Sequence, residues 1–153
     1  MSQPEMQKYC TFYLDKYYFG IEVEQVQEII RFQEITPVAL APEVVKGLIN
    51  LRGQIVTAVD LRRLLELPER DAGEAPMNIV VRTPLGAFSL LADRIGDVLE
   101  LADENFESPP ANLSGMAGEL IQRAYKLEGT LLLTMAIDKV VSADVLNRLK
   151  KAA

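Results

Sequence analysis

Two distant segments of the chain share one pattern of charge, glycine and aliphatic residues. They are LRGQIV at 51–56 and LEGTLL at 127–132. In each segment a charged residue and a glycine interrupt an apolar run, a pattern typical of a tight β-hairpin. Glycine tolerates the positive φ that such turns need. Gly53 and Gly129 are therefore predicted to be structural turn residues.

A second pair of segments repeats in the same way. FGIEVEQVQEII at 19–30 aligns with FSLLADRIGDVL at 88–99. Phenylalanine aligns with phenylalanine, and the acid Glu24 aligns with Asp93. Because the two matches follow each other in the same order, an internal duplication is favoured over a chance alignment of apolar strands.

Short strands separated by turn signals account for most of the chain. A helical turn is expected at about 24–30, a short helix after Asp60 and a last helix after Ser142, whereas 104–118 has the composition of a linker. Such a pattern indicates a mainly β fold, which we interpret as two similar small barrels packed side by side. The expected strands cover 9–14, 17–23, 45–51, 54–59, 77–83 and 86–92, followed by a hairpin at about 120–136.

The sequence offers few groups for catalysis. It contains no histidine, which removes the commonest general base and metal ligand. The single cysteine, Cys10, alternates with Phe12 and Leu14, so a buried small hydrophobe is favoured over a nucleophile. Phosphate-loop, dinucleotide and metal-ligand spacings are absent. We therefore expect no enzyme activity, no cofactor and no metal.

Charge and hydropathy narrow the class of protein further. The net charge of −6 disfavours nucleic-acid binding, and Arg62-Arg63 is the densest internal basic pair. Apolar runs fall far short of the ~20 residues of a membrane helix, and no signal peptide is recognised. One cysteine suits a reducing compartment. We expect a single domain over 1–153 that is cytoplasmic and, because of its acidic charge, mostly monomeric alone.

Five stretches, in this order, carry a family resemblance: YYFGIEVEQVQEII, APEVVKGLINLRGQIVTAVDLR, ADRIGDVLEL, PPANLSG and YKLEGTLLL. From about residue 9 to 149 the chain resembles the CheW family of chemotaxis coupling proteins, and KGLINLRGQIVTAVDLR is the most specific part. The resemblance implies two five-stranded SH3-like β-barrels around a shared core. Their approximate limits are 8–70 and 76–150, with strand exchange between them left open.

The resemblance also implies a function. Members are non-enzymatic adaptors that join the cytoplasmic tip of methyl-accepting chemotaxis receptors to the regulatory domain of the histidine kinase CheA, at membrane-associated receptor arrays. Val26 and Val98, nearly equivalent in the repeats, either line a cleft for a receptor helix or pack as ordinary core residues. The implied receptor-binding residues are Val26, Glu28, Asn50, Arg52 and Val98, and the implied kinase-binding residues are Ile35 and Ile55.

One position departs from the family pattern. Many relatives have an LDLD-like pair of acids where this chain has MAID at 135–138, so Ala136 replaces the first acid, and the cap or turn that this acid supports is open here. We expect no receiver domain after Ala153 and no kinase domain before the barrels, which disfavours fused couplers and CheA itself.

Several alternatives remain. Arg52 is either a solvated turn residue or an exposed anchor for a partner. The adaptor could serve another receptor–kinase pathway, such as surface motility. The competing classes of protein are a small-molecule-binding barrel, an enzyme with an unrecognised carboxylate pair and a nucleic-acid-binding barrel.

Overall fold

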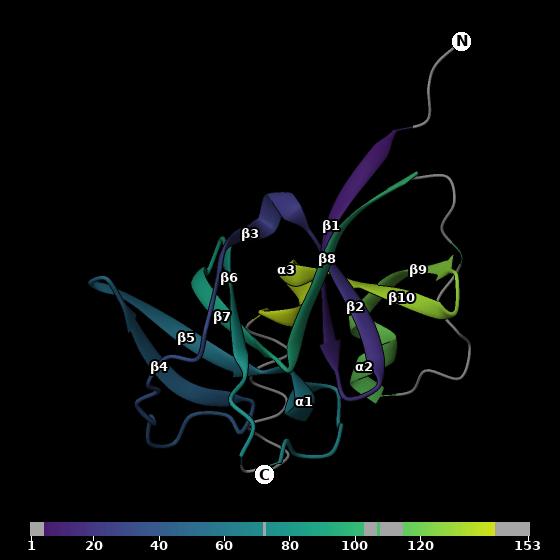
Figure 1. The fold of residues 1–153 in the computed structure, drawn as a ribbon. Coiled ribbons are helices and arrows are strands. Elements are labelled where there is room, and N and C mark those ends of the chain that lie inside the picture. The colour runs from purple at the N-terminus through teal and green to yellow at the C-terminus, as the bar shows by residue number, and fades with distance from the viewer. Residues whose placement is uncertain (1–4, 72, 103–106, 108–114, 143–153) are drawn as a thin grey trace.

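Figure 1 shows the computed structural model of the chain, which describes residues 5–71, 73–102, 107 and 115–142. The helix predicted after Ser142 lies outside the described residues. The strands are β1 (Met6–Leu14), β2 (Tyr17–Glu22), β3 (Val26–Ile30), β4 (Val45–Leu51), β5 (Gln54–Asp60), β6 (Met77–Thr83), β7 (Gly86–Ala92), β8 (Arg94–Ala102), β9 (Ile121–Leu127) and β10 (Thr130–Met135). The short helices are η1 (Val23–Gln25), α1 (Leu61–Leu64), α2 (Gly115–Leu120) and α3 (Ile137–Val140).

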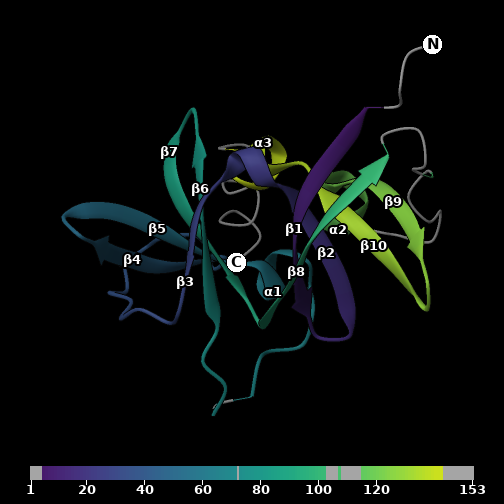
Figure 2. The same cartoon turned by 45° about the horizontal axis from the view of Figure 1, so that its top comes forward.

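The strands form two five-stranded sheets that lie side by side (Figures 1 and 2). The β1 sheet has the order β8-β1-β2-β10-β9, and the β6 sheet has the order β3-β6-β7-β5-β4. Neighbouring strands are antiparallel except for two parallel pairs, β2 with β10 and β5 with β7. The expected mainly β fold with two similar five-stranded units is confirmed.

Both sheets contain strands from both halves of the chain. The chain begins in the β1 sheet, crosses to the β6 sheet through η1 and returns at Asp93, between β7 and β8. The limits 8–70 and 76–150 therefore do not coincide with the two sheets. The physical reason is pairing between strands that are distant in sequence. These pairs are the parallel pairs β2 with β10 and β5 with β7, and the antiparallel pairs β1 with β8 and β3 with β6. Strand exchange is thus part of the fold.

The strand registers repeat between the two sheets. Thr57 lies opposite Phe88 in the β6 sheet, and Leu133 lies opposite Phe19 in the β1 sheet. The alignments of 19–30 with 88–99 and of 51–56 with 127–132, continued by one position, convert one pair into the other. Exchanging β1–β5 with β6–β10 likewise converts one strand order into the other. The two sheets therefore have the same internal arrangement, as a duplication requires.

A shared apolar core joins the sheets, and each sheet has a smaller core of its own. Leu90 packs in the shared core while its neighbour Leu91 packs within the β6 sheet, because successive strand side chains point to opposite faces. The shared core includes Phe12, Phe19, Val59, Leu61, Leu90 and Ile137. The separate core of the β1 sheet contains Tyr9, Tyr18, Tyr125 and Leu132. The β6 sheet has two small clusters, one of Ile49, Ala58 and Leu91 and one of Leu51, Val56 and Val80.

Two local predictions were wrong. The helical turn expected at 24–30 is a 3-10 turn over Val23–Gln25 followed by strand β3. A β-bulge between Val26 and Glu28 shifts the strand register, so Val26 and Ile29 both pack against the shared core. The bulge therefore imitates a helical spacing. The linker expected at 104–118 contains the start of helix α2. Among the described residues, no helix has the length and apolar character to cross a membrane.

Candidate protein-binding site

Arg52 and Glu28 form an ion pair at the surface of the β6 sheet. Arg52 lies in the turn between β4 and β5, whereas Glu28 lies on β3, and β3 and β4 are the two edge strands of this sheet. The Arg52 side chain is 69% exposed and that of Glu28 is 24% exposed. The pair therefore bridges the sheet edges and leaves most of the guanidinium accessible to a partner.

The β4–β5 turn holds Arg52 in a defined backbone conformation. Leu51 pairs with Gln54, and the two central residues have positive φ, 52° at Arg52 and 89° at Gly53. This is the geometry of a two-residue hairpin turn whose twist matches the strands. The Asn50 side-chain oxygen accepts a hydrogen bond from the Gly53 amide at 2.9 Å, which closes the turn. The predicted residues Glu28, Asn50 and Arg52 therefore lie around one turn.

The repeat-equivalent turn, between β9 and β10, differs in charge and conformation. Gly129 again has a positive φ, 77°, but Glu128, in place of Arg52, does not. Lys126, in place of Asn50, forms an ion pair with Glu107 at 3.8 Å. The turn tip is thus acidic, which makes it an internal control for the Arg52 turn.

The two valines expected at the receptor surface have different environments. Val26 is half-buried on β3 and packs against the shared core. Val98 is 61% exposed on β8, in the other sheet. The repeat alignment relates Val26 to Ile95, which also packs against the shared core. Of the two valines, only Val98 therefore presents most of its side chain to a partner.

The two isoleucines expected at the kinase surface also differ. Ile35 is half-buried against Ile49, Ala58 and Leu91 in the β6 sheet. Its neighbour Thr36 pairs with Leu48 of β4 through two backbone hydrogen bonds of 2.8 Å, which fix this segment on the sheet. Ile55 is 59% exposed, directly after the Arg52 turn and opposite Asn50. Ile55 is therefore the accessible member of the pair.

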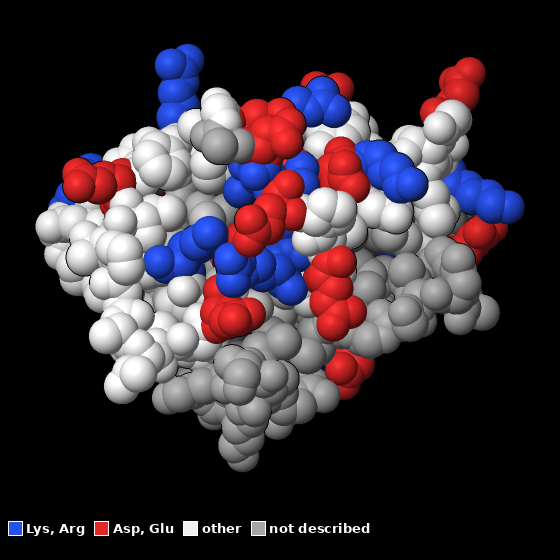
Figure 3. Space-filling view, turned by 90° about the horizontal axis from the view of Figure 1, so that it is seen from below, with Lys and Arg blue, Asp and Glu red and all other residues white. Residues whose placement is uncertain are grey.

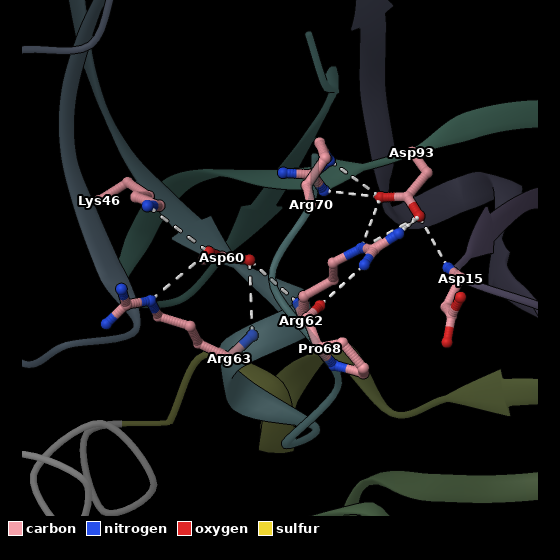
Figure 4. Close-up of polar contacts among 8 residues, drawn as sticks. All are labelled: Asp15, Lys46, Asp60, Arg62, Arg63, Pro68, Arg70 and Asp93. Carbon is pink, nitrogen blue, oxygen red and sulfur yellow. Dashed lines mark hydrogen bonds and ion pairs between the residues drawn. The ribbon is translucent and has the colours of Figure 1, made fainter. Parts of the chain in front are cut away.

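An ionic cluster centred on Asp93 was not identified from the sequence (Figure 4). Arg62 donates from Nε to Oδ1 at 3.0 Å and from Nη2 to Oδ2 at 2.5 Å. Arg70 donates from Nε and Nη2 to Oδ1 at 3.0 and 2.8 Å, and the Asp15 amide donates to Oδ2 at 2.7 Å. The side chains of Arg62, Arg70 and Asp93 are each only 10% exposed. The cluster is therefore largely removed from water.

The cluster stabilises the charged form of Asp93. Burial alone would raise the pKa of this carboxyl, but hydrogen bonds from Arg62, the Asp15 amide and Arg70 outweigh burial, and the pKa is lowered. The pKa of Arg62 is raised, chiefly by its hydrogen bond to Asp93. Both shifts favour the ion pair over its neutral forms.

The departure at Ala136 removes a helix cap. In the first repeat, Asp60 accepts hydrogen bonds from the amides of Arg62 and Arg63 at 3.0 and 3.5 Å and thereby caps α1. The equivalent residue before α3 is Ala136, whose side chain makes no cap hydrogen bond. Its backbone conformation, φ −87° and ψ 100°, nearly equals that of Asp60, φ −84° and ψ 101°. The capping geometry is thus kept without the capping oxygen.

A polar pocket lies beside the Asp93 cluster. It measures about 640 Å³ and is lined mainly by charged residues, including Asp15, Glu69, Glu74, Asp93 and Arg94. A small-molecule pocket is usually apolar, and a general acid needs a raised pKa, the opposite of the shift at Asp93. In Figure 3 acidic and basic side chains are intermixed on one face, without the continuous basic stripe of a nucleic-acid groove.

Neither the cysteine nor the acids of the described residues form a recognisable catalytic or metal centre. Cys10 is buried, and burial raises the pKa of its thiol, so the reactive thiolate is disfavoured. Within the described ranges, no group of three or more His, Cys, Asp or Glu residues could hold a metal ion. The largely exposed guanidinium of Arg52 is accessible for contact with a partner.

Comparisons with known proteins agree with this fold. The chain is 27% identical to the Chemotaxis protein CheW of Treponema pallidum over 143 residues, 91% of this chain and 84% of that protein. It is 29% identical to the Chemotaxis protein CheW of Klebsiella aerogenes over 138 residues, 90% of this chain and 83% of that protein. The scaffolding protein TtCheW from Thermoanaerobacter tengcongensis has the same fold, with a TM-score of 0.77, 22% identity and coverage of 88% of this chain and 90% of that one.

The family model described as "CheW-like domain" matches residues 8–145. This range covers all ten strands of the two sheets except the first two residues of β1. The chain therefore belongs to the CheW family.

Proposed function

We propose that this chain is a non-enzymatic adaptor that couples methyl-accepting chemotaxis receptors to the histidine kinase CheA. Membership of the CheW family supports the proposal, and the relatives above are named as chemotaxis proteins. The observation that carries it is the Arg52–Glu28 ion pair, in which a largely exposed arginine is held at the tip of a hairpin. Arginine held in this way is a common anchor at protein interfaces.

The receptor tip, a helical hairpin by family resemblance, would contact the surface around the Arg52 turn. Glu28 engages Nη2 of Arg52, and a guanidinium has five N–H donors, so donors remain for acceptors on a partner. Glu28 also restricts the arginine side chain before binding, which lowers the entropy lost in the complex. Val98 would add an apolar contact from the β1 sheet, and Asn50 maintains the turn.

The regulatory domain of the kinase would contact the segment that contains Ile35 and Ile55. Ile55 offers an exposed apolar side chain, and the half-buried Ile35 packs its segment against the β6 sheet. Receptor and kinase would thus use different side chains around the β6 sheet, and the receptor surface would also include Val98 of the β1 sheet. Each interface need bury only ~1,200–1,600 Å² in total, because simultaneous contacts within an array raise the effective affinity.

The proposal also includes the oligomeric state of the protein and its location in the cell. A net charge of −6 opposes self-association at low salt, so the chain alone is expected to be mostly monomeric. It would act in the cytoplasm and be recruited to receptor arrays at the membrane. With no histidine in the sequence, it would transmit proximity and conformation while the kinase performs the phosphate chemistry.

A sedimentation experiment tests the adaptor role. Membrane vesicles that contain a chemotaxis receptor are mixed with CheA, with or without this chain, and the kinase in the pellet is measured. The wild-type chain and Glu128→Ala should both increase the sedimented kinase, whereas Arg52→Ala should not. If the wild-type chain leaves the amount of kinase in the pellet unchanged, the proposed coupling is wrong.

A further inference from the structure

The chain crosses between the two sheets at two places, and the repeat relates them. One crossing is η1, which contains Glu24, and the other is Asp93. Glu24 and Asp93 occupy equivalent positions of the repeat. The two crossings therefore have the same topology, so their side-chain contacts can be compared position by position.

The crossing at Asp93 is fixed by contacts to both sheets. The Asp15 amide belongs to the β1–β2 turn of the β1 sheet. Arg62 belongs to α1, which follows β5, and Arg70 belongs to the connection that leads to β6. Arg62 also donates from Nη1 to the Pro68 carbonyl at 2.7 Å, which ties this connection to the cluster. One carboxylate thus binds groups from both sides of the crossing (Figure 4).

The crossing at η1 has no equivalent cluster among the described residues. Glu24 is exposed, and its carboxylate makes no hydrogen bond or ion pair with any residue that the structure describes. Continuing the alignment of 51–56 with 127–132 along the chain places Asp138 at the position of Arg62, so the arginine partner is replaced by a second acid. An ion pair between these two equivalent positions therefore cannot form at this crossing.

The interface between the sheets needs directional contacts to define one angle. The shared core is apolar, and hydrophobic attraction depends on buried area rather than on direction. Forked hydrogen bonds between arginine and carboxylate, in contrast, constrain distance and orientation, and they are strong where water is excluded. At the Asp93 crossing, the cluster supplies the directional contacts between the sheets. The shared core mainly holds the sheets together.

We propose that the Asp93 cluster fixes the angle between the β1 and β6 sheets, and that η1 is the hinge about which the sheets move when the cluster is opened. Asp93 is thus a positioning residue, and its role does not depend on which proteins the chain binds. Opening the cluster should change the distance between the sheets, which a general loss of stability would not do.

The distance between two spin labels, one on each sheet, tests whether the Asp93 cluster fixes the angle between the sheets. The labels are attached at Gln54→Cys and Thr130→Cys, which are exposed, repeat-equivalent positions at the starts of β5 and β10, in a Cys10→Ala background. The wild-type cluster should give one narrow distance distribution. Asp93→Asn should broaden or shift it, while Glu24→Gln at the equivalent crossing should leave it unchanged.

Two further variants distinguish an effect on the angle between the sheets from a general loss of stability. Leu132→Val shortens a buried side chain in the separate core of the β1 sheet, so it should lower stability and keep the narrow distribution. Arg70→Gln leaves the one-to-one pair of Arg62 with Asp93 and should give an intermediate distribution even if Asp93→Asn does not fold. In Asp93→Asn, exchange of the Asp15 amide with deuterium should become about tenfold faster. A wild-type distribution in Asp93→Asn or Arg70→Gln, or equal broadening in Leu132→Val, would overturn the inference.

Discussion

Glu28 and Arg52 form an ion pair although Glu28 lies on one edge strand of the β6 sheet and Arg52 in the turn that follows the other edge strand. An exposed pair of this kind contributes only about 0.2–1 kcal/mol to stability. Its removal therefore leaves the fold intact, and any larger effect on partner binding can be attributed to recognition. This separation of stability from binding makes the turn suitable for experiment.

The Asp93 cluster should contribute much more to stability. Asp93→Asn leaves the guanidinium groups of Arg62 and Arg70 without their buried counter-ion, so the free energy of unfolding should fall by about 3 kcal/mol. Glu24→Gln, at the exposed equivalent position, should change it by less than about 0.5 kcal/mol. Urea unfolding measures both values. Equal stabilities of the two variants would show that the cluster is energetically neutral.

Acid should weaken the same cluster. The pKa of Asp93 is lower in the folded than in the unfolded chain, so its contribution is complete above the unfolded value of about 4 and is lost as the pH falls through the folded value. Urea unfolding between neutral pH and about pH 3 should therefore show a steeper loss of stability for the wild type than for Asp93→Asn. Parallel pH profiles of the two proteins would contradict the assignment.

Two glycines should differ in their tolerance of a side chain. A Cβ at Gly53 would contact nothing within 4 Å, so Gly53→Ala pays only for its φ of 89°, about 1 kcal/mol. A Cβ at Gly47 would lie 2.2 Å from the Thr36 carbonyl oxygen and 2.8 Å from Ile35 Cγ2. Gly47→Ala should therefore cost about 3 kcal/mol or more. Thermal unfolding measures the stability of both variants. A Gly47→Ala variant more stable than Gly53→Ala would refute the close approach of Thr36 to Gly47.

A helix cap should be recoverable at Ala136. Since the backbone angles of Ala136 nearly equal those of the capping Asp60, the carboxylate of Ala136→Asp should accept a hydrogen bond from the first turn of α3 and stabilise the protein by about 0.5–1 kcal/mol. Asp60→Ala, the reverse change in the other repeat, should destabilise it by at least about 1 kcal/mol. Denaturant midpoints test the pair of variants. No gain from Ala136→Asp would contradict the expected cap.

Local signals in the sequence predicted the hairpins well. The strands expected at 77–83 and 86–92 match β6 and β7, and those at 45–51 and 54–59 match β4 and β5 within one residue. These elements are defined by alternation of apolar residues and by glycine turns, which are properties of neighbouring residues. The repeat was also visible, because its two alignments are preserved in the strand registers.

Contacts between distant residues were not predictable in the same way. The parallel pairing of Thr57 with Phe88 has no local sequence signal, so strand exchange between the expected subdomains could only be left open. Asp93 is distant in sequence from both Arg62 and Asp15, and it was noticed only through its alignment with Glu24. The signal that could have pointed to the cluster is a difference between the repeats. Glu24 and Asp93 are both acids, whereas the position of Arg62 is occupied by Asp138 in the other copy.

Titration of Arg52→Ala against a receptor-tip fragment tests the proposed function most directly. The variant should keep its stability, because the ion pair is exposed, while its affinity for the receptor fragment falls by about 1 to 3 kcal/mol, roughly 5- to 150-fold. Its affinity for the regulatory domain of the kinase should be nearly unchanged, and Glu128→Ala should bind both partners as the wild type does. Wild-type affinity of Arg52→Ala for the receptor fragment would show that Arg52 is only a solvated turn residue.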